Sequence, residues 1–180
     1  MYLCRIFLLM TIGIGLSFAS AGQVRAEDDF MFTSSSAKLC LDGHGRGKDV
    51  KASSCRTPFG AQRWSIDKNA GQIMHIKSNL CLAVSNSNRA NGARVVLWPC
   101  NRGTNQRWSF GSVGASASQI KSALHGKCID VSKVNHSGKR ANIHLWDCHR
   151  GKNQLWTMRE VKRTYKKKIK SERKFRILDR

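Results

Sequence analysis

The sequence predicts a closed all-β domain with threefold pseudo-symmetry, made of twelve short strands. One pattern of cysteines, apolar residues and tryptophans occurs three times along the chain, and such internal repetition indicates a repeated structural unit. Short apolar or alternating runs lie between turn-forming clusters of Gly, Asn and Ser, as expected for strands. No segment before residue 159 shows helical periodicity.

Each repeat contains the same landmarks in the same order. An apolar residue lies eight positions before a first cysteine, another lies five positions before a second cysteine, and a Gln-x-Trp triplet follows. In chain order the landmarks are Phe32, Cys40, Val50, Cys55 and Trp64, then Ile73, Cys81, Val95, Cys100 and Trp108, then Ile120, Cys128, Ile143, Cys148 and Trp156. Each repeat therefore offers four strands, the first strand of the domain lying around Phe30 to Phe32 and the last ending at Met158.

The tryptophans of the three Gln-x-Trp triplets are expected in the core. Each strand buries one face, so apolar positions that recur in every repeat converge on a common axis. Trp64, Trp108 and Trp156 are bulky and regularly placed, and large aromatic side chains dominate core energetics. We therefore interpret them as structural residues rather than as ligand contacts.

The six cysteines after residue 26 are expected to form three disulfides within repeats. An even number of cysteines in an exported chain is typical of a disulfide framework. The repeats pair them as Cys40–Cys55, Cys81–Cys100 and Cys128–Cys148, and loops of this length stabilise a domain by about 3 kcal/mol each. A zinc site is the alternative, but the chain has no C-x-x-C pair and its histidines lack ligand spacing. We expect neither a metal nor a cofactor.

Residues 1–26 have the pattern of an export signal. Arg5 precedes an almost wholly apolar run from Ile6 to Ala19, and small residues offer cleavage sites after Ala21 or Ala26. A membrane anchor is the alternative, but the apolar run of about 14 residues is short against the roughly 20 that span a bilayer. The sequence thus predicts a secreted protein, extracellular or periplasmic, with its folded domain over residues 27–158.

The chain is strongly basic, and much of the charge lies at its C-terminal end. It has 32 Lys and Arg against 11 Asp and Glu, and loss of Arg5 and Arg25 with the signal would lower the net charge from +21 to +19. Residues 159–180 form a basic tail with 11 Lys and Arg, three acids and a net charge of +8. Such charge favours anionic partners. We interpret the tail as a solvated extension, the alternative being an amphipathic helix on an anionic surface.

The motifs Cys-Leu-Asp, Trp-x-Cys and Asn-Gln-x-Trp recur with substitutions over about residues 30–158 and resemble the ricin-B or R-type lectin family. The resemblance implies a β-trefoil, a six-stranded barrel capped by three hairpins, with one sugar pocket per repeat where the pocket is intact. In that family, sugar is bound by the Asp of the first motif, by the aromatic residue two positions before the second cysteine, and by the Asn of the third motif. The Gln that follows supports the Asp.

By this resemblance the third repeat has a complete pocket. It carries Asp130, Trp146, Asn153 and Gln154, with His144 where family members often have a polar contact. An aromatic ring receives the apolar face of a sugar, and carboxylate and amide groups select its hydroxyls. Each residue also has a structural alternative, since Asp130 and Asn153 are common turn residues and Trp146 would suit a partly buried core position.

The second repeat has an incomplete version of the same pocket. It keeps Trp98, Asn105 and Gln106, but Ala83 replaces the aspartate. We expect a weak or degenerate site there, and Trp98 is as compatible with the core as with a ligand.

The first repeat departs further from the family pattern. Asp42 and Gln62 are present, but Ser53 and Ala61 replace the aromatic residue and the Asn. We expect no sugar binding in this repeat, because it lacks the ring on which a sugar would stack.

These observations favour a non-catalytic carbohydrate-binding protein for galactose-type or related glycans. The chain shows no nucleophile-elbow motif, no paired carboxylates at a defined site and no metal motif, so we do not expect an enzyme. Two alternatives stay open: a cell-binding or delivery subunit that needs a partner toxin chain, and a basic adhesin for anionic glycan, lipopolysaccharide or membrane surfaces. Nucleic acid is not an expected partner of an exported chain.

Overall fold

The computed structural model describes residues 29–56, 60–113 and 116–161. The predicted signal peptide 1–26 lies outside the described residues, and so do residues 162–180 of the predicted tail. Within the described part of the chain, no helix has the length and apolar character needed to cross a membrane.

The described residues form twelve strands and three single turns of 3-10 helix. The strands are β1 Asp29–Ser34, β2 Leu39–Asp42, β3 Lys51–Ser54, β4 Trp64–Asp67, β5 Gln72–His75, β6 Leu80–Val84, β7 Ala93–Pro99, β8 Trp108–Ser112, β9 Ser118–Ser122, β10 Cys128–Val134, β11 Arg140–Trp146 and β12 Trp156–Val161. The turns are η1 Ser85–Ser87, η2 Thr104–Gln106 and η3 Lys152–Gln154. The predicted β-trefoil of three four-stranded repeats is confirmed, each repeat supplying four consecutive strands.

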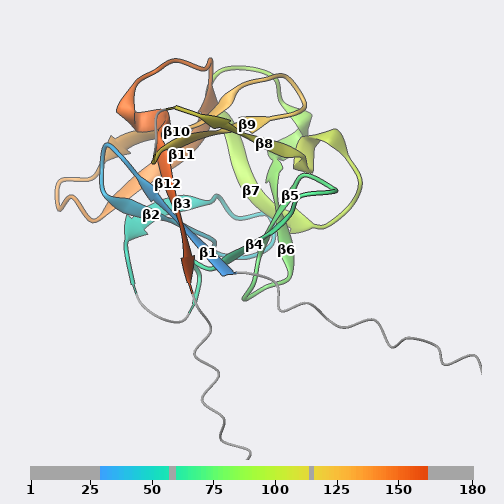
Figure 1. Cartoon of the computed structure of the whole chain (residues 1–180), viewed down its shortest axis with the longest axis horizontal. Coiled ribbons are helices and arrows are strands. Elements are labelled where there is room, and N and C mark those ends of the chain that lie inside the picture. The colour runs from blue at the N-terminus through green and yellow to red at the C-terminus, as the bar shows by residue number, and fades with distance from the viewer. Residues whose placement is uncertain (1–28, 57–59, 114–115, 162–180) are drawn as a thin grey trace, which may run out of the picture.

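The barrel, which can be followed in Figure 1, consists of β1, β4, β5, β8, β9 and β12. β1 pairs antiparallel with β12 and β4, β4 with β5, β8 with β9, and β9 with β12. The last two neighbours, β5 and β8, meet where the Trp108 N–H donates to the Gly71 carbonyl at 2.7 Å. Each Gln-x-Trp tryptophan begins the fourth strand of its repeat, so the three indoles occupy equivalent places in the barrel.

Three hairpins, β2–β3, β6–β7 and β10–β11, cap the barrel. Neighbouring hairpins also contact one another, because β11 pairs with both β3 and β7. The loop between β2 and β3 reaches the second repeat through backbone bridges from Arg46 to Leu97 and from Asp49 to Val96. Each hairpin therefore packs on the adjacent repeat, which brings residues of two repeats together at the surface.

The predicted core tryptophans are confirmed. Trp64, Trp108 and Trp156 are only 0%, 4% and 1% exposed. A buried indole needs an acceptor for its N–H, and each one donates to the carbonyl of the residue after the first cysteine of its repeat. These carbonyls belong to Leu41, Leu82 and Ile129, at 3.1, 2.9 and 3.2 Å.

The three predicted disulfides are also confirmed. Cys40 is bonded to Cys55, Cys81 to Cys100 and Cys128 to Cys148. Each bond joins the start of one hairpin strand to a cysteine one or two residues beyond the partner strand, so the repeated register brings the sulfurs together.

The end of the domain differs from the prediction. β12 continues to Val161 and pairs with β1 along its whole length, from Ser34↔Trp156 to Asp29↔Val161. The last strand therefore ends three residues beyond Met158, where the sequence predicted its end. Residues 157–160 are exposed, so apolar alternation gives no signal for them, and it is the backbone ladder to β1 that holds them in the barrel.

Candidate functional site

In every repeat the glutamine of Gln-x-Trp organises the backbone around the second cysteine. Its Oε1 accepts the N–H of the residue after this cysteine, at 2.8 Å in all three repeats. Its Nε2 donates to the carbonyl of the residue before the cysteine, at 2.9 to 3.0 Å. The glutamines are Gln62, Gln106 and Gln154, and all three are buried. We call this arrangement the glutamine frame.

In the third repeat the frame holds the carboxylate of Asp130. This residue lies on β10 with 4% exposure, so the alternative of a turn residue is excluded. Gln154 Nε2 donates to Asp130 Oδ2 at 2.9 Å, and Asn153 Nδ2 lies 2.9 and 2.8 Å from the two carboxylate oxygens. Two amides therefore fix the orientation of an acceptor group before any ligand arrives.

Trp146 supplies an exposed aromatic face beside this carboxylate. It is 42% exposed at the end of β11, so it is not a core residue. His144 is two residues earlier on the same face of β11, with ring centroids 5.5 Å apart and its Nε2 3.6 Å from Asp130 Oδ1. Asp130, His144, Trp146 and Asn153 line one cavity of about 290 Å³, with Gln154 buried and bonded to the carboxylate.

One further residue of this cavity, His149, was not predicted. Its Nε2 lies 3.6 Å from Asp130 Oδ2, on the opposite oxygen from His144. It follows Cys148, and Gln154 holds its backbone N–H. The sequence could have pointed to His149 through its position directly after the second cysteine. All three repeats carry a polar residue there, and the residue differs in each: Arg56, Asn101 and His149.

The turn between His149 and Asn153 requires a glycine. A Cβ on Gly151 would lie 2.6 Å from both Asn153 Oδ1 and His149 Cε1. Gly103 has the same role in the second repeat, where a Cβ would lie 2.6 Å from Asn105 Oδ1. Both glycines therefore permit the tight turn that brings the Asn side chain into the cavity.

Two histidines lie on either side of the Asp130 carboxylate. The Nε2 atoms of His144 and His149 are each 3.6 Å from a different carboxylate oxygen. Over residues 29–56, 60–113 and 116–161, no group of three or more His, Cys, Asp or Glu side chains is arranged to hold a metal ion.

The second repeat keeps the aromatic ring without the carboxylate. Trp98 on β7 is 43% exposed, which excludes a core position. Ala83 stands where Asp130 stands in the third repeat, and Asn105 Nδ2 donates instead to the Val84 carbonyl at 3.2 Å. Gln106 keeps the glutamine frame. A cavity of about 270 Å³ remains beside Trp98.

In the first repeat an arginine side chain of the same repeat is already bonded to the aspartate carboxylate. Asp42 on β2 is fully buried, and its Oδ2 accepts from Arg56 at 2.7 Å and from Gln62 at 3.1 Å. Ser53 takes the place of the aromatic ring and is itself buried. Arg56 therefore competes for the acceptor that a sugar hydroxyl would need.

Twelve strands in three repeats, a glutamine frame in each and an exposed aromatic ring in two of them define a lectin-like β-trefoil. A family model described as "Ricin-type beta-trefoil lectin domain-like" matches residues 18–98, 60–146 and 104–179, which together span most of the chain. The protein therefore belongs to the ricin-type β-trefoil lectin family.

Solved structures with the same fold include whole lectins and parts of larger proteins. The designed threefold-symmetric protein ThreeFoil is 23% identical with a TM-score of 0.68, over 74% of this chain and 99% of that chain. The ricin B-like lectin of Macrolepiota procera, in complex with lactose, is 19% identical with a TM-score of 0.64, over 77% and 99%. The hemolytic lectin CEL-III is 24% identical with a TM-score of 0.60, and the match covers 72% of this chain but 29% of that one.

Proposed function

We propose that the protein is a secreted lectin with one working sugar pocket in the third repeat, selective for galactose-type glycans. The observation that carries the proposal is the juxtaposition of an oriented carboxylate and an exposed indole. Asp130 is held by Asn153 and Gln154, and Trp146 stands free beside it. No other repeat within the described residues combines the two groups.

The chemistry of the cavity suits a hexose. The C–H face of the sugar stacks on Trp146, while the carboxylate of Asp130 accepts hydrogens from two adjacent hydroxyls. The amide of Asn153 offers both a donor and an acceptor to the same edge of the ring. His144 and His149 flank the carboxylate and add polar contacts on either side. That the Macrolepiota procera lectin takes lactose, which contains galactose, supports this choice of sugar.

A glycan array on the mature, oxidised protein tests the proposal. Trp146→Ala and Asp130→Asn are expected to lower binding of galactose-terminated glycans at least about tenfold, since both remove a direct ligand contact. Trp98→Ala is the matched control because the exposed fractions of Trp98 and Trp146, 43% and 42%, are nearly the same. Asp42→Asn is expected to leave binding intact. Equal losses in all four variants would contradict a single pocket in the third repeat.

Export is part of the proposal and has its own test. The three disulfides are suited to an oxidising compartment. Protein recovered from the medium or periplasm is expected to begin at Gly22 or Glu27, according to the cleavage site used. N-terminal sequencing distinguishes these two results from an uncleaved chain that begins at Met1, which would argue against export by a cleaved signal.

A delivery role is the second candidate function. The fold matches parts of larger toxins, including CEL-III and a mosquitocidal holotoxin, where it covers 29% and 17% of the respective chains. One pocket binds sugar weakly, so useful avidity needs a second contact, from a partner toxin chain or from the basic tail on an anionic surface. Truncation after Val161 keeps β12 complete. If the truncated protein bound cells with the same salt dependence as the full chain, the tail would have no electrostatic role.

A further inference from the structure

The cavity beside Trp98 in the second repeat has a different chemistry from the pocket of the third repeat. It is lined by Gly47, Ala83, Val84, Ser85, Asn86, Ser87, Val96, Trp98, Asn101 and Asn105. No acidic side chain is among these residues of the described chain. An anionic ligand would therefore meet no fixed carboxylate at the place where Asp130 stands in the third repeat.

A cation stands at the edge of this cavity. The guanidinium carbon of Arg46 lies 4.9 Å from the centroid of the Trp98 ring, the geometry of a cation–π contact. Arg46 comes from the β2–β3 loop of the first repeat, which is anchored on β7 because the Gly47 N–H donates to the Leu97 carbonyl at 2.7 Å. The position of the cation is thus set by the packing of two repeats.

The Trp98 ring stays exposed although the guanidinium of Arg46 lies over it. Trp98 is 43% exposed, and Trp146, whose ring lies 5.5 Å from that of His144, is 42% exposed. The ring therefore keeps as much free surface as the one that we propose stacks a sugar. A ligand can contact the indole and the guanidinium together.

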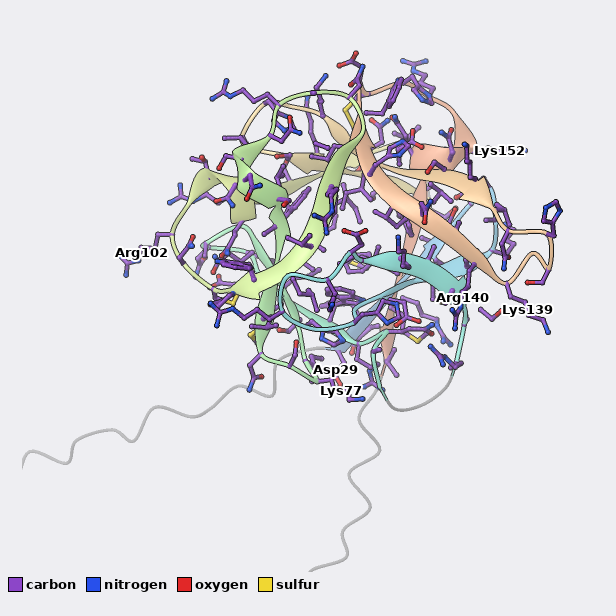
Figure 2. All side chains as sticks on the ribbon, turned by 180° about the vertical axis from the view of Figure 1, so that it is seen from behind. Asp29, Lys77, Arg102, Lys139, Arg140 and Lys152 are labelled. Atoms are coloured by element: carbon purple, nitrogen blue, oxygen red, sulfur yellow. A yellow bond between two sulfur atoms is a disulfide. The ribbon has the colours of Figure 1, made fainter. Side chains whose placement is uncertain are left out.

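The other charges on the loop leave Arg46 available. Asp49 is the carboxylate of the same loop, and it is paired with Arg94 at 2.7 Å and with Lys51 at 3.4 Å. Arg102, the neighbour of the cavity residue Asn101, is a further basic side chain that projects from this part of the surface (Figure 2). The surrounding field thus favours an anion.

The polar turn η1 also lines the cavity. Asn86 and Ser87 in η1 have φ values of 52° and 50°, in the left-handed region that side chains other than glycine rarely adopt. Such conformations cluster at ligand-binding segments. With Ser85 they carry hydroxyl and amide groups of the kind that select sugar hydroxyls.

We propose that the second repeat is a separate site for an acidic sugar, whose ring stacks on Trp98 and whose carboxylate or sulfate pairs with Arg46. A guanidinium fork matches the oxygens of either group, and the loss of the aspartate at Ala83 removes the repulsion that such a ligand would meet. The site does not depend on the galactose pocket proposed for the third repeat. The second repeat lacks the carboxylate that we propose binds a neutral sugar in the third repeat, and it is selective for acidic sugars instead.

The test uses the full oxidised chain with Trp146→Ala, which silences the third repeat. Ligand-observed NMR titration at physiological salt compares methyl glucuronide with methyl glucoside, and galactose 6-sulfate with galactose. We expect the acidic member of at least one pair to bind about tenfold more tightly than the neutral member, and the two pairs tell carboxylate from sulfate recognition. Adding Trp98→Ala is expected to abolish binding of both members.

Arg46→Gln is expected to remove the preference for the acidic sugar, while Arg140→Gln is expected to keep it. Arg140 is a matched control because it is exposed, its loss changes the net charge equally, and it lies across the molecule from Arg102, the neighbour of the cavity residue Asn101 (Figure 2). The proposal would be overturned if acidic and neutral sugars bound with equal affinity, or if none of the four sugars bound. It would also be overturned if the preference for the acidic sugar survived Arg46→Gln. Galactose binding by Trp98→Ala with Trp146 intact tests the third repeat independently.

Discussion

The first and third repeats hold equivalent aspartates in the same glutamine frame, but the two carboxylates have different additional partners. Asp42 and Asp130 are both buried, and each accepts from the glutamine of its own Gln-x-Trp triplet. In the first repeat Arg56 takes the carboxylate at 2.7 Å. In the third repeat the residue at the position of Arg56 is His149, whose Nε2 stays 3.6 Å away. The carboxylate is therefore paired with an arginine in the first repeat and hydrogen-bonded to two side-chain amides in the third.

The difference teaches that scaffold and site are separable in this fold. The scaffold consists of the disulfide, the buried tryptophan and the glutamine frame, and it is the same in all three repeats. The candidate site differs at three positions: two residues before the second cysteine, one residue after it, and the residue before the glutamine of Gln-x-Trp. These positions carry Ser53, Arg56 and Ala61 in the first repeat and Trp146, His149 and Asn153 in the third.

The largest expected effect tests whether the scaffolds of the first and third repeats contribute equally to the stability of the domain. Trp64→Ala and Trp156→Ala are each expected to lower the free energy of unfolding by about 3–5 kcal/mol, because both indoles are fully buried and leave a cavity. Urea titration followed by circular dichroism measures the loss. A much smaller cost for Trp64→Ala would show that the first repeat, without a sugar pocket, is also a weaker part of the scaffold.

A smaller effect tests the ion pair that distinguishes the two aspartates. Arg56→Ala is expected to cost about 1 kcal/mol, since the guanidinium side chain is 65% exposed and water screens the pair. His149→Ala is expected to change stability by less than about 0.5 kcal/mol, as for most exposed positions. A double-mutant cycle of Arg56→Ala with Asp42→Asn isolates the pair. No coupling in that cycle would mean that Arg56 does not close the first repeat.

The smallest effect concerns a buried histidine found in the second repeat alone. His75 is 2% exposed, and the equivalent positions of the other repeats are Ser34 and Ser122. Burial lowers the pKa of His75, and Asp42 partly opposes this shift. Since the unfolded chain then binds the extra proton more readily, stability is full above about pH 6.5 and falls as the pH drops below it.

His75→Phe is expected to reduce this loss of stability. The measurement is the difference between the free energies of unfolding at pH 7 and pH 5, which should be smaller for the variant than for the unmodified protein. An unchanged difference would assign the pH dependence to other groups, such as His125, whose pKa burial also lowers.

Much of the third-repeat pocket was predictable because its residues keep a fixed distance from the repeat landmarks. Asp130, Trp146 and Asn153 are placed by the first cysteine, the second cysteine and the Gln-x-Trp triplet, and the structure brings them to one cavity. His149 was missed although it has an equally fixed position, because the three repeats carry three different residue types there. Only its approach to Asp130 reveals its place in the site.

The sequence by itself determined the twelve strands, the pairing of the cysteines and the burial of the three tryptophans, because these follow from local periodicity repeated in register. Tertiary structure decided what each pocket became. The approach of Arg46 to Trp98 and the extension of β12 to Val161 depend on contacts between repeats, and the landmarks within a single repeat contain no record of that packing. The closure of Asp42 by Arg56 lies within the first repeat, but it depends on the conformation of an arginine side chain that no landmark specifies.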